Sequence, residues 1–360
     1  MAAEQHHQLL SRACVQSWLA LVAGLLLGAP GHAAPSVPTY DRLPRKVLIG
    51  TVVGGVPIYS RPLEERLQRI DAIVGEMSEK ARSQFPGKRL DLVVIPEYFV
   101  ARPGEQLLQK VVRLGEVEPS LSACARKYAC YLVAPMLLRE EGEPQRLSNA
   151  AFLFDRTGRV AGIYRKVHPV AGHGSEVLEG GLTPGHEFPV FDCDFGKLGI
   201  QICFDMMYSD GWRALAEKGA EIVALPSASS ETIRPSMYAL QNGYYIVSAT
   251  PWHHAAVFSP IGTIEAQATR EGEVLVHQVD LSYEVLHWDQ DLDEGAAVTR
   301  RFGDKAGYLY YQDQDIGIYW SNDPTRTIGQ MMATFGVLPV NLEVERLRGV
   351  QDGQRGAPIK

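Results

Sequence analysis

The chain has 360 residues, of which 46% are hydrophobic and 21% charged, and this globular composition excludes a disordered chain, a collagen and a coiled coil. Its 35 lysines and arginines against 42 aspartates and glutamates give a formal net charge of −7, so binding to a nucleic-acid backbone is not expected. Five cysteines are too few for a scaffold built on disulfides.

An apolar, uncharged segment near the N-terminus predicts export. Residues 18–29 are too few to cross a bilayer, which takes roughly 20 apolar residues, but they match the core of a secretory signal. Small residues, Gly31 and Ala33, follow at the spacing that a signal peptidase requires. We therefore predict a signal peptide over residues 1–33, a leader over 34–45, and a mature protein that is periplasmic or secreted and free of the membrane. An uncleaved membrane anchor is the alternative.

The first part of the mature chain alternates strands with helices. Apolar, β-branched runs predict buried strands over residues 46–53, 91–97 and 129–137. Apolar residues recur every three or four positions over 63–81, which predicts an amphipathic helix, and 118–128 is a second helix candidate. Such alternation is typical of a sheet covered by helices.

The following part adds a hairpin and further strands. Residues 149–155 and 159–166 flank an Arg-Thr-Gly turn and predict the hairpin. The remaining candidates are strands over 197–205, 221–227, 244–251, 261–268 and 273–280, and helices over 212–219 and 235–243. We predict one α/β domain over residues 46–284. A less regular C-terminal extension over 285–360 is a candidate for packing at a dimer interface.

Three of the predicted strands end in chemically reactive side chains. Glu97 ends the second strand, Lys166 ends the hairpin, and Cys203 lies near the end of the next strand. Strand ends of an α/β sheet are the usual place for ligands. Each residue also has an ordinary interpretation: a paired carboxylate, a lysine that reaches water, and a buried cysteine.

Together the three side chains predict acyl transfer through a thioester. A free thiol has a pKa of about 8.5 and is mostly protonated at neutral pH, so it needs a general base, which Glu97 would supply. The ammonium of Lys166 and the backbone N–H of Phe204 would stabilise the oxyanion. Water is the second nucleophile. Neither a cofactor nor a metal is expected.

The sequence resembles the nitrilase or carbon–nitrogen hydrolase superfamily. The resemblance lies in VVIPEYF, in NAAFLFDRTGRVAGIYRKVHP and in GKLGIQICFDMMYSDGWRALAEKGAEIVALPS, which are similar to the family's Glu, Lys and Cys segments and follow the same order. It implies an αββα sandwich, two of which usually stack into a four-layer assembly, and therefore a homodimer or a higher homo-oligomer. The family often has a second glutamate before a Pro-Gly pair; Glu179 fits this spacing better than Glu176, with the role of orienting Lys166 and the leaving amine.

The type of carbon–nitrogen bond is indicated by the residues after the cysteine. Cys203 is followed by Phe-Asp, which resembles the amidase-type branches, whereas nitrilases more often have Cys-Trp-Glu. A small amide or N-carbamoyl compound is therefore the preferred substrate. The alternatives are a nitrile hydrolase, a catalytically silent binding protein on the same fold, and a periplasmic ligand-binding protein, which would need two similar lobes.

Residues that follow other strand ends are candidates for binding the substrate. They are Tyr98, the loop 227–230, Trp252 and His253. His253 and His254 are adjacent and would face opposite ways, so they are poor candidates for chelating one metal ion.

Three further features leave alternatives open. His168 is the nearest partner for a Cys–His hydrolase. A bridge between Cys124 and Cys130 has no support beyond the presence of both residues. Tyr238 and Gln241 stand where the family commonly has an arginine and a glutamate, which puts a structural ion pair in doubt.

Overall fold

The computed structural model describes residues 38–55, 60–102, 104, 106, 109–140 and 146–356. The predicted signal peptide over 1–33 lies outside these residues, as does the first part of the predicted leader. Within the described part of the chain, no helix is both long enough and apolar enough to cross a membrane.

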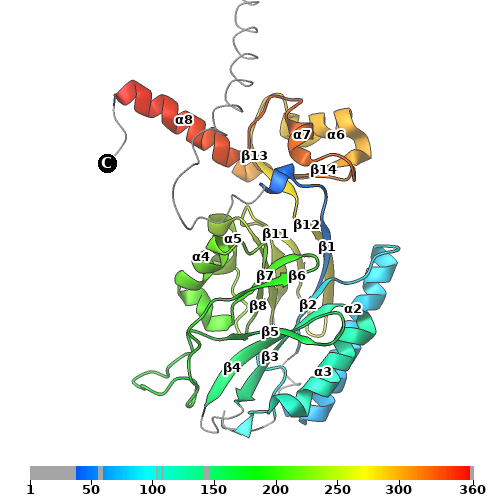
Figure 1. Ribbon diagram of the computed structural model, residues 1–360, viewed down its shortest axis with the longest axis vertical. Helices are drawn as coiled ribbons and strands as arrows, with labels where there is room; N and C mark the ends of the chain where they lie inside the picture. Colours follow the sequence, from blue (N-terminus) through cyan, green and yellow to red (C-terminus); the bar gives the residue numbers. More distant parts are fainter. Residues whose placement is uncertain are drawn as a thin grey trace, which may run out of the picture. The chain divides into compact units, whose positions relative to one another are not determined.

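The first sheet has the strand order β12-β1-β2-β3-β4-β5. Its strands are β1 (Lys46–Val52), β2 (Leu92–Val94), β3 (Tyr131–Arg139), β4 (Leu147–Phe154), β5 (Val160–Arg165) and β12 (Val274–Asp280). β1, β2 and β3 run parallel, and β4 and β5 form the predicted antiparallel hairpin. The helices α2 (Leu63–Gln84) and α3 (Leu114–Tyr128) cover the outer face (Figure 1), because the apolar stripe of α2 is buried in one cluster with Val93 of β2.

The second sheet has the order β11-β10-β9-β8-β7-β6, in which β7, β8 and β9 run parallel. Its strands are β6 (Val190–Cys193), β7 (Gly196–Ile200), β8 (Ile222–Pro226), β9 (Tyr245–Ala249), β10 (Ala255–Phe258) and β11 (Ile264–Ala268). The short strands β6 and β10 are additions to the elements predicted from the sequence. The 3-10 helix η5 (Cys203–Met207) and the helices α4 (Asp210–Glu217) and α5 (Ile233–Asn242) follow the parallel strands.

Apolar clusters define the layers of the domain. One cluster lies between the two sheets and contains Ile49 of β1, Val133 of β3 and Ile200 of β7. Another, around Trp212 of α4, fills the outer face of the second sheet. The order is therefore helix, sheet, sheet, helix in one domain, which confirms the αββα sandwich expected from the sequence.

The residues after 282 form a third sheet that the sequence pattern does not reveal. β13 (Tyr283–His287), β15 (Ile316–Ser321) and β14 (Ala306–Tyr311) pair antiparallel in the order β13-β15-β14. The helices α6 (Ala296–Phe302) and α7 (Ile328–Met332) contribute to its apolar cluster, and α8 (Val340–Arg355) follows with no buried residue (Figure 1). The boundary expected after residue 284 thus falls inside β13.

Candidate active site

Cys203 begins η5 at a sharp turn after β7. Its φ is 45°, a left-handed conformation that is uncommon for a residue other than glycine and has to be held by its surroundings. The buried carboxylate of Asp205 provides this support: its Oδ2 accepts hydrogen bonds from the backbone N–H of Ile202 at 2.8 Å and from the hydroxyl of Tyr164 at 2.7 Å. These buried hydrogen bonds therefore hold the backbone turn at Cys203, which we call the elbow.

His168 belongs to this support. Its backbone N–H donates to Oδ1 of Asp205 at 2.9 Å, its Nδ1 lies 3.1 Å from the same oxygen, and its Nε2 lies 3.4 Å from Oδ2 of Asp210. Hydrogen bonding to Asp205 raises the pKa of His168, and the charges of Asp205 and Asp210 add to this against the opposing effect of burial. Both ring nitrogens thus face carboxylates, which is not the arrangement of a Cys–His pair.

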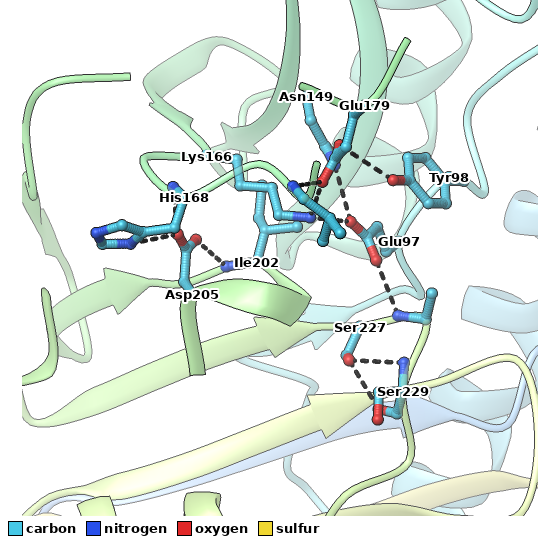
Figure 2. Close-up of polar contacts among 12 residues, drawn as sticks. Glu97, Tyr98, Asn149, Lys166, His168, Glu179, Ile202, Asp205, Ser227 and Ser229 are labelled. Carbon is cyan, nitrogen blue, oxygen red and sulfur yellow. Dashed lines mark hydrogen bonds and ion pairs between the residues drawn. The ribbon is translucent and has the colours of Figure 1, made fainter. Parts of the chain in front are cut away.

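Glu97 and Lys166 meet in the interior. The Nζ of Lys166 lies 3.0 Å from Oε1 of Glu97, and neither side chain is more than 1% exposed. Glu97 follows β2 and Lys166 follows β5, so the pair comes from two strands of the first sheet. Figure 2 shows the two side chains in contact. A buried pair of this kind has to be compensated by close geometry and further hydrogen bonds, since each charge has lost its water.

Glu179 is the second carboxylate of the cluster, and it comes from a loop. Its Oε1 lies 2.6 Å from Nζ of Lys166 and accepts a bond from the backbone N–H of Val170 at 3.1 Å. Its Oε2 accepts a bond from the hydroxyl of Tyr98 at 3.2 Å. Glu176 is exposed. Of the two glutamates weighed from the sequence, Glu179 is therefore the one that the fold brings to Lys166.

The loop that carries Glu179 is closed at its base. A bridge joins Ala171 to Leu178, and the backbone N–H of Glu179 donates to the carbonyl of Val170 at 2.7 Å. Residues 171–177 between these contacts are exposed. The position of Glu179 is thus set by the base of the loop.

The electrostatics of Cys203 follow from this cluster. Burial raises the pKa of the thiol to about 12, the charge of Glu97 adds to the rise, and Lys166, the hydroxyl of Ser227 and the backbone N–H of Ala228 oppose it. Burial alone would lower the pKa of Lys166, but Glu97, Cys203 and Glu179 together raise it well above its ordinary value. The resting site therefore holds a protonated thiol beside a charged ammonium and needs a base to form the thiolate.

The loop after β8 links the second sheet to this cluster. The backbone N–H of Ala228 donates to Oε2 of Glu97 at 2.9 Å. The hydroxyl of Ser227 donates to the carbonyl of Ser229 at 2.7 Å and accepts a bond from its N–H at 2.9 Å, which shapes the turn. The loop 227–230 therefore contacts the carboxylate of Glu97 through Ala228, and its contact with substrate stays a prediction.

The other residues predicted for the site are Phe204, Trp252 and His253. Phe204 is half-buried in the first turn of η5, where backbone N–H groups have no partner within the helix. Trp252 and His253 are exposed on the turn after β9, and none of their described hydrogen bonds or ion pairs reaches Glu97, Lys166 or Glu179. Their contact with substrate remains a prediction.

One polar residue of the cluster was missed in the sequence. Asn149 of β4 is 1% exposed, and its amide Nδ2 donates to Oε1 of Glu97 at 2.8 Å and to Oε2 of Glu179 at 3.3 Å. The available signal is its place at the start of an apolar strand that pairs with the strand carrying Lys166. Among the described residues, no group of three or more His, Cys, Asp or Glu side chains is arranged to hold a metal ion.

Comparison with known proteins decides the family. The family model for carbon–nitrogen hydrolases matches residues 51–285, which is more than half of the chain. The chain belongs to the carbon–nitrogen hydrolase family. It is an enzyme of the nitrilase superfamily, as the segments around Glu97, Lys166 and Cys203 predict.

Individual relatives agree with this assignment. The omega-amidase NIT2-A of Xenopus laevis is 28% identical over 219 residues, which cover 54% of this chain and 79% of the relative. The structure of Nit3 of Saccharomyces cerevisiae, a member of branch 10 of the nitrilase superfamily, superposes with a TM-score of 0.54 at 24% identity, covering 67% of this chain and 91% of Nit3. An amidase from Nesterenkonia sp. gives a TM-score of 0.53 at 22% identity and covers 72% and 97% of the two chains. The two structures support the shared fold.

Tyr238 is one of the residues for which the sequence predicts a departure from the family pattern. It stacks on Trp212 with ring centroids 4.7 Å apart and an interplanar angle of 6°. An aromatic stack therefore joins α5 to α4. Cys124, Cys130 and Cys193 are free thiols, like Cys203.

Proposed function

We propose that this carbon–nitrogen hydrolase cleaves a small amide or N-carbamoyl compound into an acid and ammonia or an amine, with Cys203 as nucleophile. The observation that carries the proposal is the buried contact of Lys166 with two carboxylates, Glu97 and Glu179, beside the strained elbow of Cys203. The names of the relatives, omega-amidases and an amidase, favour an amide over a nitrile.

In the first half of the reaction, Glu97 takes the proton of the thiol, and the sulfur of Cys203 forms a bond to the carbonyl carbon. The electron pair of the carbonyl moves to its oxygen, where Lys166 and the backbone N–H of Phe204 stabilise the negative charge. The carbon–nitrogen bond then breaks, and the proton passes from Glu97 to the leaving nitrogen. Glu179 keeps Lys166 in place near that nitrogen.

In the second half, Glu97 takes a proton from water, whose oxygen attacks the thioester carbon. The carbon–sulfur bond breaks, the acid leaves, and the proton returns from Glu97 to the sulfur of Cys203. The high pKa of the resting thiol, about 12, is consistent with this scheme because the thiolate is made only when the base acts.

A substrate panel tests the proposal. Short amides, N-carbamoyl compounds and nitriles are incubated with the enzyme, and released ammonia or amine is measured. We expect turnover of an amide or carbamoyl compound, an acyl adduct on the Cys203 peptide in the mass spectrum, and no turnover by Cys203→Ala. Cys193→Ala, which removes another free, partly buried thiol, is the matched control and should retain activity. Turnover of nitriles alone, or activity in Cys203→Ala, would contradict the proposal.

The assembly and the location of the protein complete the proposal. Exposed apolar side chains recur along α5 at Ile233, Met237 and Leu240, which is the spacing of one helix face. We propose that this face packs against a second copy in a homodimer or higher oligomer, and that the mature enzyme is exported after cleavage near Ala34. Sedimentation of Met237→Glu against wild type tests the first point, and N-terminal sequencing of exported protein tests the second.

A further inference from the structure

Asn149 joins the two glutamates of the site through one amide group. Its Nδ2 donates to Oε1 of Glu97 at 2.8 Å and to Oε2 of Glu179 at 3.3 Å, as Figure 2 shows. The backbone carbonyl of Asn149 also accepts the N–H of Lys166 at 2.8 Å. The residue is thus bonded to all three charged members of the cluster.

The chemistry of the neighbours fixes the orientation of this amide. Ionised carboxylates only accept hydrogen bonds, so the amino end of Asn149 has to face them. The other end, Oδ1, is buried and has no hydrogen-bond partner among the described residues. An unsatisfied buried acceptor costs stability. The side chain is therefore arranged to serve as a donor to Glu97 and Glu179.

The charge of the cluster explains why a neutral donor is suited to this place. Two carboxylates share the ammonium of Lys166; Glu97 and Lys166 are buried, and the side chain of Glu179 is 7% exposed. Nζ of Lys166 binds Oε1 of each carboxylate, and the amide of Asn149 adds a second donor to Oε1 of Glu97. Oε1 of Glu97 thus accepts from two donors, whereas Oε2 accepts from the backbone N–H of Ala228, a group that also interacts with the thiol of Cys203.

We propose that Asn149 is a positioning residue that locks the carboxylate of Glu97 so that Oε2 receives the proton of the thiol, while it couples Glu97 to Glu179. This inference rests on the proposed function, because it assigns a role within that reaction. Asn149 contacts the carboxylates and needs no contact with substrate. Its loss should therefore lower kcat while leaving KM nearly unchanged.

The main test variant is Asn149→Leu, which keeps the branching and the number of side-chain heavy atoms and removes the donor. A hydrogen bond to a charged group corresponds to roughly 10- to 100-fold in rate, so we expect a fall in kcat of that size. Hydrogen bonds to a carboxylate favour its charged form, so the acid limb of the kcat/KM profile should move to higher pH by about one unit. Asn149→Ala, where water can fill the space, provides the same test if the leucine variant fails to fold.

Ser148→Ala is the matched control. Ser148 is the neighbouring residue of β4, is equally buried, and donates to Glu140 at 2.6 Å, away from the cluster. This variant should keep the wild-type kcat and pH profile. A double-mutant cycle with Glu179→Gln measures the coupling between Asn149 and Glu179. In the Glu179→Gln background, the loss of Asn149 should lower kcat by a several-fold smaller factor than in the wild type.

The outcomes separate this inference from the proposed function. If wild type turns over amides and Cys203→Ala does not, but folded Asn149 variants keep the wild-type kcat and acid limb, the positioning role is wrong and the triad stands. Strictly additive effects with Glu179→Gln would also overturn it. If Cys203→Ala is active, the proposed function fails first, and that result is obtained without any Asn149 variant.

Discussion

The backbone N–H of Ala228 donates a 2.9 Å hydrogen bond to Oε2 of Glu97, and the two residues come from different sheets of the sandwich. Glu97 follows β2 of the first sheet, and Ala228 follows β8 of the second. The carboxylate is therefore held from one sheet by Lys166 and from the other by a loop. A correct packing of the two sheets is required before the site is complete.

Substitution of Glu97 by glutamine should remove most of the activity. The two oxygens of Glu97 accept hydrogen bonds from Lys166, Asn149 and Ala228. A glutamine amide has one accepting oxygen and one donating amino group. The amino group would therefore face a donor where the carboxylate accepts a hydrogen bond. Loss of a general base costs about 10²–10⁴ in rate. We expect kcat to fall by this factor in folded Glu97→Gln, with a lower melting temperature. Wild-type kcat in a folded variant would rule out the role of base.

Lys166→Met should also be nearly inactive. The variant removes the ammonium that neutralises two carboxylates and stabilises the oxyanion, and loss of one such donor costs about 10²–10³ in rate. Because the groups act as a unit, the double variant with Glu97→Gln should be little slower than the poorer single variant. Steady-state kinetics on monodisperse proteins check this, and a multiplicative loss in the double variant would show that the two residues act independently.

The conformation of the turn at Cys203 should depend on Asp205 more than on Asp210. Asp205 is fully buried and accepts bonds from Ile202, Tyr164 and His168, whereas Asp210 is exposed. Asp205→Asn replaces an accepting oxygen by a donor and should lower both the melting temperature and kcat. Asp210→Asn is the matched control and should change neither by much. Equal effects of the two substitutions would show that the buried bonds do not hold Cys203 in place.

The contribution of His168 to stability should depend on pH. The bond to Asp205 raises the pKa of His168, so the folded protein favours the charged form. The stabilisation is fully present below the ordinary pKa of about 6.5 and is lost as pH rises through the raised value. Unfolding by denaturant should show that His168→Gln destabilises the protein more at pH 6 than at pH 9. A cost that does not vary with pH would contradict this.

Glu284 should also make the folded protein less stable as pH rises. Burial raises the pKa of this carboxyl to about 8, with a further contribution from Asp41, and one of its oxygens has no hydrogen-bond partner among the described residues. The folded state therefore favours the neutral form, and stability falls as pH rises from about 4.5 towards 8.

Glu284→Gln removes this titration and should raise the melting temperature more at pH 8.5 than at pH 5. Glu294→Gln, at an exposed glutamate, is the control and should have a small effect at both values. If the two substitutions gave the same difference between pH 8.5 and pH 5, the buried carboxyl would not be the titrating group.

That Glu97, Lys166 and Cys203 lie close together was predictable because each residue ends an apolar strand, and a polar side chain at that point is conspicuous. The place of Asn149 in this cluster was not predictable, because a bulge between Leu153 and Phe154 shifts the register of the hairpin by one residue. A regular hairpin would have placed Ser148 beside Lys166. The third sheet escaped detection because β14, with the sequence AGYLYY, has no alternation of apolar and polar residues, and most of its residues are half-buried.

Because the base of the loop before Glu179 is closed, residues 172–177 should tolerate substitution. The bridge from Ala171 to Leu178 and the bond from Glu179 to Val170 fix the ends, so the cost of closing the loop depends only weakly on the number of residues between them. Insertions or exchanges over 172–177 can therefore accumulate without moving the carboxylate. Evolution and protein engineering share the same opportunity there, because this segment can be diversified while the charged cluster remains as it is.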